Sequence, residues 1–162
     1  AEVVEALSLC GQANCQLVVN DYWREAIEAG ADFVHLGQED LASADVGAIR
    51  AAGIRLGIST HSDEELATAL HAGPDYVALG PIYPTLLKKM PWAPQGLDRL
   101  ALWRSRLPCP LVAIGGITPD RAPAVFEAGA DSLAVITDIV THAEPEKRTE
   151  TWMALTEPMR RR

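Results

Sequence analysis

Acidic, hydroxyl-bearing and glycine residues follow short apolar runs throughout this sequence. The groups are Asn20-Asp21, Gly37 to Asp40, Ser59 to His61, Gly80 to Thr85, Gly115-Gly116 and Thr137-Asp138. Two carboxylates, Asp21 and Asp40, follow successive runs, and Mg²⁺ in proteins usually takes one or two carboxylates plus waters and substrate phosphates. The pair is therefore a candidate Mg²⁺ site. The alternative, with about equal support from spacing alone, is that each aspartate caps the helix that follows it.

Two other groups have the residue types of a phosphate site. Glycines such as Gly115-Gly116 let a phosphate approach backbone N–H groups, although a double glycine is also common in tight turns. The stretch from Pro81 to Gly96 is the longest irregular segment and carries Lys88 and Lys89. Long loops in compact domains are often functional, and a lysine there could neutralise a diphosphate. The alternative is that both lysines are solvated surface charges.

His61 has the residue type for proton transfer near neutral pH, but a single histidine is more often a hydrogen-bonded structural group. No nucleophile with a paired base stands out in the sequence, and neither does a cluster of metal-binding histidines.

The elements that must position these residues alternate along the chain. Apolar runs predict strands at Gln16 to Asn20, Phe33 to Leu36, Ile54 to Ser59, Tyr76 to Leu79, Leu111 to Ile114 and Ser132 to Ile136. Alanine-rich segments predict helices at Glu2 to Leu9, Trp23 to Ala29, Ala44 to Ala52, Asp63 to Ala72, Leu97 to Arg106 and Arg121 to Ala128. The phrase Ala-Gly-Ala-Asp, or a close variant, precedes three of the strands and marks a repeated βα unit.

Alternating βα units predict an α/β fold with a parallel sheet, and polar residues at nearly every strand end favour a (β/α)₈ barrel. An open dinucleotide-binding sheet is less favoured, because no Gly-x-Gly-x-x-Gly follows the first strand. The barrel needs eight strands and the sequence shows six. We therefore expect a single domain over residues 1–162 that lacks the first two strands, which would precede Ala1 in the full protein.

Length and composition exclude several classes of protein. A chain of 162 residues has room for one core, and 48% hydrophobic with 22% charged residues is typical of a globular protein. The formal charge of −8 argues against nucleic acid as a partner. The longest apolar runs are far shorter than a membrane span. The three cysteines are an odd number without metal-finger spacing, so we expect a reduced, cytoplasmic protein.

Six ordered motifs together resemble the thiamine phosphate synthase family. They are Val19 to Asp21, His35 to Leu41, Gly57 to His61, Asp75 to Thr85, Ala113 to Ile117 and Ala134 to Thr137. The resemblance implies a (β/α)₈ barrel enzyme, dependent on Mg²⁺, that joins 4-amino-5-hydroxymethyl-2-methylpyrimidine diphosphate to a thiazole phosphate and releases diphosphate. It implies that the binding partners are small phosphorylated substrates, and it is compatible with a homodimer.

The resemblance also implies a role for each matching residue. Asp21 and Asp40 would bind Mg²⁺, and the diphosphate would meet the side chains of Asn20, Ser59, Thr85 and Lys88. Lys88 and Ser59 are the predicted catalytic residues. Gly116, Ile136 and Thr137 would bind the thiazole phosphate. The implied chemistry is dissociative, so it needs charge neutralisation and alignment of two substrates but no protein nucleophile.

The chain departs from the family pattern at two places. Leu87 stands where the family has a second threonine, and a Gln-x-Arg-x-Lys motif of the family's first strands has no counterpart. Two alternatives follow. One is the thiazole tautomerase branch of the family, which would use His61 as a base. The other is a phosphate-binding protein without activity. Asn20, Asp21 and Asp40 favour the transferase, because proton transfer alone needs no site for Mg²⁺ and diphosphate.

Overall fold

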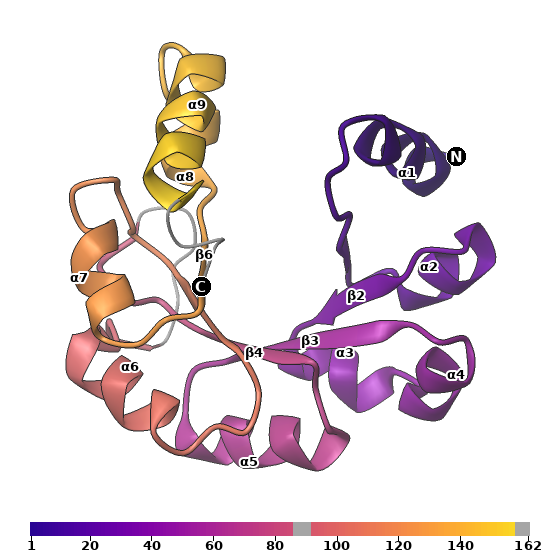
Figure 1. Cartoon of the computed structure of the whole chain (residues 1–162). Coiled ribbons are helices and arrows are strands. Elements are labelled where there is room, and N and C mark those ends of the chain that lie inside the picture. Colours follow the sequence, from indigo (N-terminus) through magenta and orange to yellow (C-terminus); the bar gives the residue numbers. More distant parts are fainter. Residues whose placement is uncertain (86–91, 158–162) are drawn as a thin grey trace. The chain divides into compact units, whose positions relative to one another are not determined.

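The computed structural model describes residues 1–85 and 92–157. Six strands occur among them: β1 (Val19–Asn20), β2 (Phe33–Leu36), β3 (Arg55–Thr60), β4 (Tyr76–Leu79), β5 (Leu111–Ile114) and β6 (Ser132–Ala134). The helices are α1 (Glu2–Gln12), α2 (Trp23–Ala29), α3 (Gln38–Ser43), α4 (Val46–Ala51), α5 (Asp63–Ala72), α6 (Gly96–Arg104), α7 (Ala122–Glu127), α8 (Thr137–Val140) and α9 (Pro145–Thr156) (Figure 1).

The strands form one sheet in the order β1-β2-β3-β4-β5-β6. The pairs β1 with β2, β2 with β3, and β5 with β6 are parallel. Each strand is followed by at least one helix, so the predicted α/β fold with six βα units is confirmed. Sequential order of parallel strands with helical crossovers is the winding of a (β/α) barrel.

Several predicted boundaries were wrong. The first strand covers only Val19–Asn20, and the last ends at Ala134 instead of Ile136. Three helices were not predicted: α3, α8 and α9. Asp40 accordingly lies in the first turn of α3 and not in a loop. The chain divides into two compact units, Ala1–Ala78 and Leu79–Arg162.

The core of the first unit lies between strands β2 and β3 and the helices beside them. Val34, Leu36 and Ile58 on the strands are completely buried, as are Ala26 on α2 and Ile49 on α4. Strand β3 is buried on both faces over most of its length, as the run of apolar residues predicts. Full burial of each large aliphatic side chain contributes about 1.5–3 kcal/mol.

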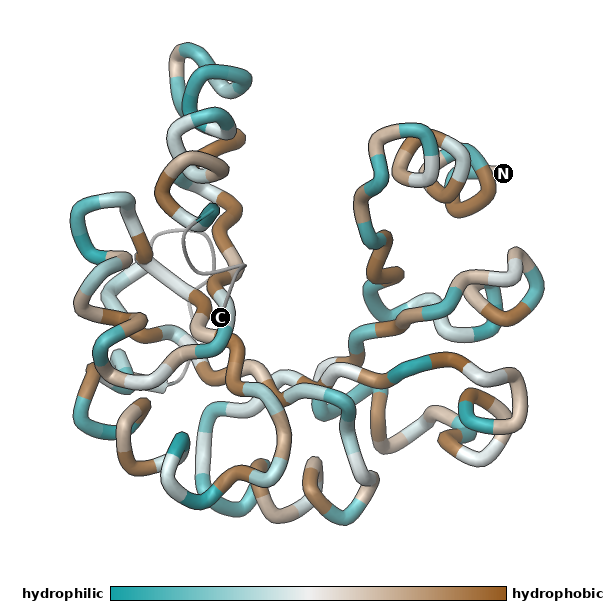
Figure 2. The backbone as a smooth tube through the Cα atoms, in the orientation of Figure 1, coloured by the Kyte–Doolittle hydropathy of each residue, from teal (hydrophilic) through white to brown (hydrophobic). Residues whose placement is uncertain are grey.

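The second unit has its own core, formed by α6, β5 and α7. Leu100 and Trp103 on α6, Leu111 on β5 and Val125 on α7 are completely buried. Figure 2 shows that hydrophobic and hydrophilic residues alternate along the helices, which is the pattern of helices with one buried face. Each unit can therefore hold its strand ends in place with its own packing.

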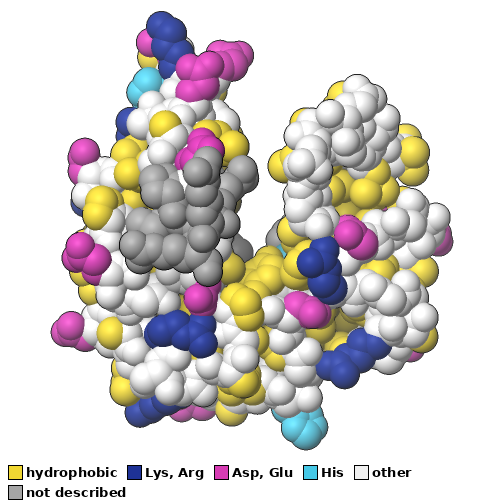
Figure 3. Space-filling view, in the orientation of Figure 1, with side chains coloured by type: hydrophobic (Ala, Val, Ile, Leu, Met, Phe, Trp, Pro, Cys, Tyr) yellow, Lys and Arg dark blue, Asp and Glu magenta, His cyan; other side chains and the backbone are white. Residues whose placement is uncertain are grey.

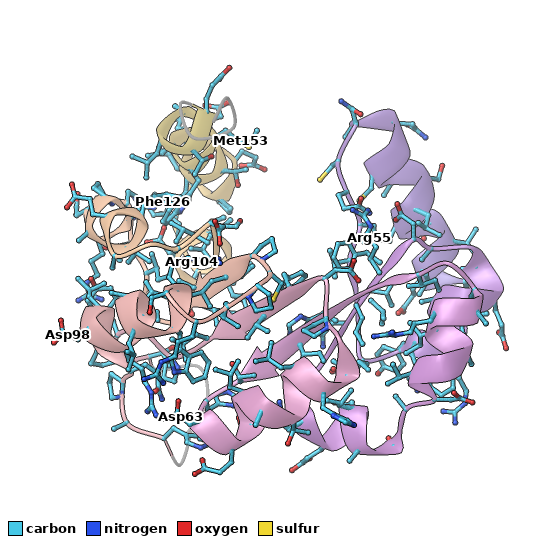
Figure 4. The ribbon with its side chains drawn as sticks, turned by 60° about the horizontal axis from the view of Figure 1, so that its bottom comes forward. Arg55, Asp63, Asp98, Arg104, Phe126 and Met153 are labelled. Atoms are coloured by element: carbon cyan, nitrogen blue, oxygen red, sulfur yellow. The ribbon has the colours of Figure 1, made fainter. Side chains whose placement is uncertain are left out.

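Two of the three repeated helix-to-strand connections share one hydrogen-bond pattern. The Asp75 carboxylate accepts a hydrogen bond from the Leu56 N–H at 2.7 Å, and the Asp131 carboxylate accepts one from the Leu111 N–H at 2.7 Å. In both cases the aspartate N–H also donates back to the carbonyl of the same leucine. Arg104, labelled in Figure 4, adds an ion pair to Asp131. Asp75 and Asp131 thus fix where β4 and β6 enter the sheet. Asp32, the third aspartate of the repeat, instead accepts hydrogen bonds from the side chains of Gln16 and Arg55.

Charges are spread over the surface of the described residues. The face in Figure 3 shows acidic and basic side chains interspersed, without a continuous basic stretch. No helix in residues 1–85 or 92–157 is both long and apolar enough to cross a bilayer.

Candidate active site

Asp21 is held in an unusual backbone conformation directly after strand β1. Its φ of 66° lies in the left-handed region, which non-glycine residues seldom adopt. Its N–H donates to the His35 carbonyl at 2.8 Å, and its carboxylate accepts a hydrogen bond from the Gly37 N–H. The Asn20 side-chain amide donates to Asp21 Oδ2 at 2.5 Å. The bonds to His35 and Gly37, together with the bond from Asn20, offset the backbone strain and fix the carboxylate at the end of the strand.

Asp40 lies beside Asp21 and shares a hydrogen bond with it. Burial raises the pKa of Asp21, and the charge of Asp40 and the hydrogen bond between the two side chains raise that pKa further. The N-cap residues of the following helices are Tyr22 and Gly37. Neither aspartate therefore caps a helix, and the capping interpretation of the sequence was wrong. Two adjacent carboxylates are instead suited to a shared cation.

The two carboxylates open onto a pocket in the first unit. Its volume is about 190 Å³. The residues that line it are Asp21, Tyr22, Trp23, Arg24, Glu25, Asp40 and Ser43. The Arg24 guanidinium lies over the Trp23 ring, 4.2 Å from its centroid. The pocket thus combines oxygen donors with one nearby cation.

Ser59 belongs to a chain of hydrogen bonds that spans strands β2, β3 and β4. His35 Nε2 lies 2.7 Å from Ser59 Oγ, and His35 Nδ1 lies 2.7 Å from the Tyr76 hydroxyl. Burial lowers the pKa of His35 to about 4 and raises the pKa of Tyr76 to about 12, so the imidazole is neutral near pH 7. A neutral ring has one donor and one acceptor nitrogen. The bond that Ser59 makes to His35 therefore restricts the direction of the serine hydroxyl.

The other polar side chains after β3 have structural partners. The completely buried Thr60 donates its hydroxyl to the Ala78 carbonyl at 2.9 Å. His61 bonds to the Glu65 carboxylate through both its N–H and its ring nitrogen Nδ1, at 2.7 and 2.8 Å. Ser62 caps α5 by accepting a bond from the Glu65 N–H. His61 is thereby held at the start of a helix, in agreement with the structural interpretation of a single histidine.

The double glycine of the second unit is required by packing. Gly115 and Gly116 have φ values of 97° and 65°. A Cβ on Gly115 would lie 2.6 Å from Pro81 Cα, and one on Gly116 would lie 2.5 Å from the Pro84 carbonyl oxygen. The loop after β4 therefore passes too close to this turn for any larger residue. Thr85, in that loop, is partly buried.

Ile136 and Thr137 lie where strand β6 gives way to the short helix α8. Ile136 is the N-cap residue and is 52% exposed, and Thr137 is the first helical residue. Ile114 pairs with Ala134 in the parallel β5–β6 register. The segments with Gly116 and Thr137 therefore leave the sheet from neighbouring strand ends.

A profile of the family described as thiamine monophosphate synthase matches residues 1–139. The chain belongs to this family. A thiamine-phosphate synthase from Rhizobium etli is 62% identical over 160 residues, which are 98% of this chain and 78% of that protein. The thiamine-phosphate synthase of Escherichia coli K12 is 54% identical over 145 residues, covering 89% of this chain and 69% of the relative.

Solved structures agree with the thiamine monophosphate synthase assignment. The thiamine phosphate pyrophosphorylase from Pyrococcus furiosus superposes with a TM-score of 0.83 at 30% identity, over 98% of this chain and 76% of that one. A native KDPGal structure superposes with a TM-score of 0.73 at 13% identity, over 98% of this chain and 76% of that chain, and indicates the fold alone. The predicted family, its transferase function in thiamine synthesis and the barrel type of fold are confirmed.

The structure brings together part of the site that the thiamine monophosphate synthase motifs predict. Asn20, Asp21 and Asp40 are in contact within the first unit. Gly116, Ile136 and Thr137 lie in the second unit, at the ends of β5 and β6. Lys88 falls within residues 86–91, outside the described residues.

Sequence reasoning missed the side chains that support this site. His35 and Tyr76 were visible only as members of motifs, and the signal for His35 was a histidine inside a strand of otherwise buried residues. Arg148 and Trp152, which bind Asp138, had no signal because α9 was not predicted. Residues that contact each other only through tertiary packing cannot be identified as partners from their spacing in the sequence.

Proposed function

We propose that this chain joins 4-amino-5-hydroxymethyl-2-methylpyrimidine diphosphate to a thiazole phosphate, giving thiamine phosphate and diphosphate. The observation that carries the proposal is the contact between Asp21 and Asp40 beside Asn20. Two adjacent carboxylates are the oxygen ligands that a Mg²⁺ ion bound with a diphosphate requires. The substrates are inferred from family membership. The acidic pair would hold the cation that stabilises the departing diphosphate.

Asp21 and Asp40 would hold Mg²⁺. The fit rests on their chemistry, because both present carboxylate oxygens, which Mg²⁺ prefers. Burial and the charge of Asp40 raise the pKa of Asp21, so a cation between the two carboxylates would relieve their repulsion. Bound Mg²⁺ would supply positive charge for the departing diphosphate. The Asn20 amide, fixed by its bond to Asp21, would donate to a diphosphate oxygen.

The side chains around the diphosphate would act by binding and by orientation. The Ser59 hydroxyl, restricted by His35, would donate to a diphosphate oxygen, and Thr85 and Lys88 would contribute a second hydroxyl and a cation. The bond between the pyrimidine methylene carbon and the diphosphate oxygen would break, with the electron pair leaving on the diphosphate. The thiazole nitrogen would then donate its lone pair to the methylene carbon. No side chain becomes covalently attached to a substrate in this reaction, so Ser59 and Lys88 would act by stabilising the leaving group.

The thiazole phosphate would bind in the second unit, at the backbone of Gly116 and the side chains of Ile136 and Thr137. Parallel pairing of β5 and β6 supports this, because it brings the two segments off the sheet from adjacent strand ends. Backbone N–H groups at such ends are common phosphate sites in barrels.

Calorimetric titration with diphosphate, with and without Mg²⁺, tests the proposal. Asp21→Asn should lose the Mg²⁺-dependent part of the affinity. Glu39→Gln is the matched control, because Glu39 precedes Asp40 in the same turn of α3. The control should bind diphosphate as the wild type does. An affinity that does not depend on Mg²⁺, or that Asp21→Asn leaves unchanged, would show that the acidic pair is not the metal site.

Three further features stay predictions: a single domain over residues 1–162, a cytoplasmic location and a homodimer. Sedimentation equilibrium would measure the last of these directly.

A further inference from the structure

Helix α9 is tied to the turn after β6 by one aspartate. Asp138 Oδ2 accepts hydrogen bonds from Arg148 Nε and from Trp152 Nε1, both at 2.7 Å. Asp138 Oδ1 accepts a third bond from an Arg148 terminal nitrogen, also at 2.7 Å. A two-point contact between a guanidinium and a carboxylate fixes both distance and orientation. Helices α8 and α9 accordingly lie side by side (Figure 1).

The contact is protected from water, unlike the other ion pair of α9. The Asp138 side chain is 13% exposed and that of Arg148 is 24% exposed, while Trp152 is 6% exposed. The hydrogen bonds from Arg148 lower the pKa of Asp138 despite its partial burial. The neighbouring pair of Lys147 and Glu144 is 70% and 58% exposed. Exposed pairs contribute little to stability, so the contact at Asp138 is the one that determines where α9 sits.

This contact acts on the residues proposed to bind the thiazole phosphate. Asp138 directly follows Thr137, and α8 is a single turn of four residues, so fixing the Asp138 side chain fixes the direction of Thr137. Arg148 also interacts electrostatically with Asp120, which lies between Gly116 and α7 in the loop after β5.

We propose that Arg148 and Trp152 are positioning residues, which hold the α8 turn so that Thr137 and Ile136 bind the thiazole phosphate. The proposal rests on the proposed function. Neither residue belongs to the stretch that the family profile matches, which ends at residue 139. Met153, on the same helix, is labelled in Figure 4 and is 48% exposed, so α9 presents Trp152 inward and its neighbour to solvent.

Steady-state kinetics with both substrates varied test the proposal on the full protein. In Arg148→Ala the α8 turn is no longer held, so the contact between Thr137 and the phosphate should be lost. The KM for thiazole phosphate should therefore rise about tenfold, which is the effect of losing one hydrogen bond to a charged group. The KM for the pyrimidine diphosphate should stay within about twofold. Arg148→Lys keeps the charge but not the two-point geometry and should restore part of the affinity. Trp152→Phe keeps a buried aromatic ring of smaller size but removes the N–H donor, and should give a smaller shift, of about threefold.

Lys147→Gln is the matched control, because it removes the adjacent charge on the same helix and should leave both KM values unchanged. A purely structural role predicts something different. Arg148→Ala and Trp152→Phe would then lower kcat and the melting temperature, but would shift the two KM values equally. That outcome, or unchanged KM values in folded variants, would overturn the positioning role. A wild-type protein without synthase activity would overturn the proposed function instead.

Discussion

Acidification should destabilise this protein through one buried histidine. Burial lowers the pKa of His35 from 6.5 to about 4. Between these two pH values the imidazole is therefore protonated in the unfolded chain but neutral in the folded chain. Stability from this group is fully present above pH 6.5 and is lost as pH falls toward 4. From pH 7 to pH 5 the linkage relation gives a loss of about 2 kcal/mol.

The surroundings of His35 explain why its ring stays neutral in the folded protein. His35 bonds to Ser59 on one side and to the Tyr76 hydroxyl on the other. A protonated ring donates from both nitrogens, so whichever hydroxyl now donates to the ring would have to turn away. The ring also stacks on Tyr76, with centroids 5.5 Å apart, and this leaves little space for water to solvate a charge.

Thermal unfolding at pH 7 and pH 5 measures the effect. A loss of about 2 kcal/mol corresponds to a fall of about 4–8 °C in melting temperature for a chain of this size. Carboxylates also titrate in this range, so the informative quantity is the difference between the wild type and His35→Gln, whose side chain stays neutral. The variant should lose about 2 kcal/mol less than the wild type between the two pH values. His71→Gln, at an exposed position on α5, should behave as the wild type. Equal losses in wild type and His35→Gln would refute the reasoning.

Three substitutions test other parts of the structure. Asp21→Asn should raise the free energy of unfolding at pH 7 by about 1 kcal/mol, because it removes repulsion from Asp40 and because asparagine tolerates a φ of 66°; the gain should shrink in acid, where Asp21 is protonated. Gly116→Ala should lower the free energy of unfolding in urea by about 2–4 kcal/mol, through the clash with the Pro84 carbonyl. Gly57→Ala would place a Cβ 2.2 Å from the Tyr76 ring; in an absorbance titration the pKa of Tyr76, now about 12, should fall toward its ordinary value.

Among the helices, those that the sequence predicts to the residue have local end signals. Helices α2 and α5 match the predicted ranges because each ends at a left-handed glycine, Gly30 or Gly73. Helix α3 has only six residues and an N-cap, Gly37, without a side-chain bond. Helix α9 is polar over most of its surface and is held by Asp138. Local patterns cannot predict helices of this kind, because tertiary contacts stabilise them.

Some features of the candidate site could likewise be predicted from the sequence, and others could not. Asp21 and Asp40 could be predicted as neighbours because residues that follow adjacent parallel strands lie at one edge of the sheet. The spacing could not choose between capping and metal binding. The N-cap positions of Tyr22 and Gly37 exclude capping, and metal binding stays a proposal.

The double glycine shows why a motif match and a binding site are separate conclusions. Gly115 and Gly116 are needed whether or not a phosphate binds, because the loop after β4 leaves no space for a side chain at either position. A loss of activity in a glycine variant therefore cannot distinguish a damaged turn from a lost ligand contact. Thr137 lies at the end of the neighbouring strand, in a helical conformation that other residues can adopt. Removing its hydroxyl would therefore test the proposed thiazole phosphate site without changing the backbone, and a matched change at Arg148 or Trp152 would test the α9 contacts proposed to hold it.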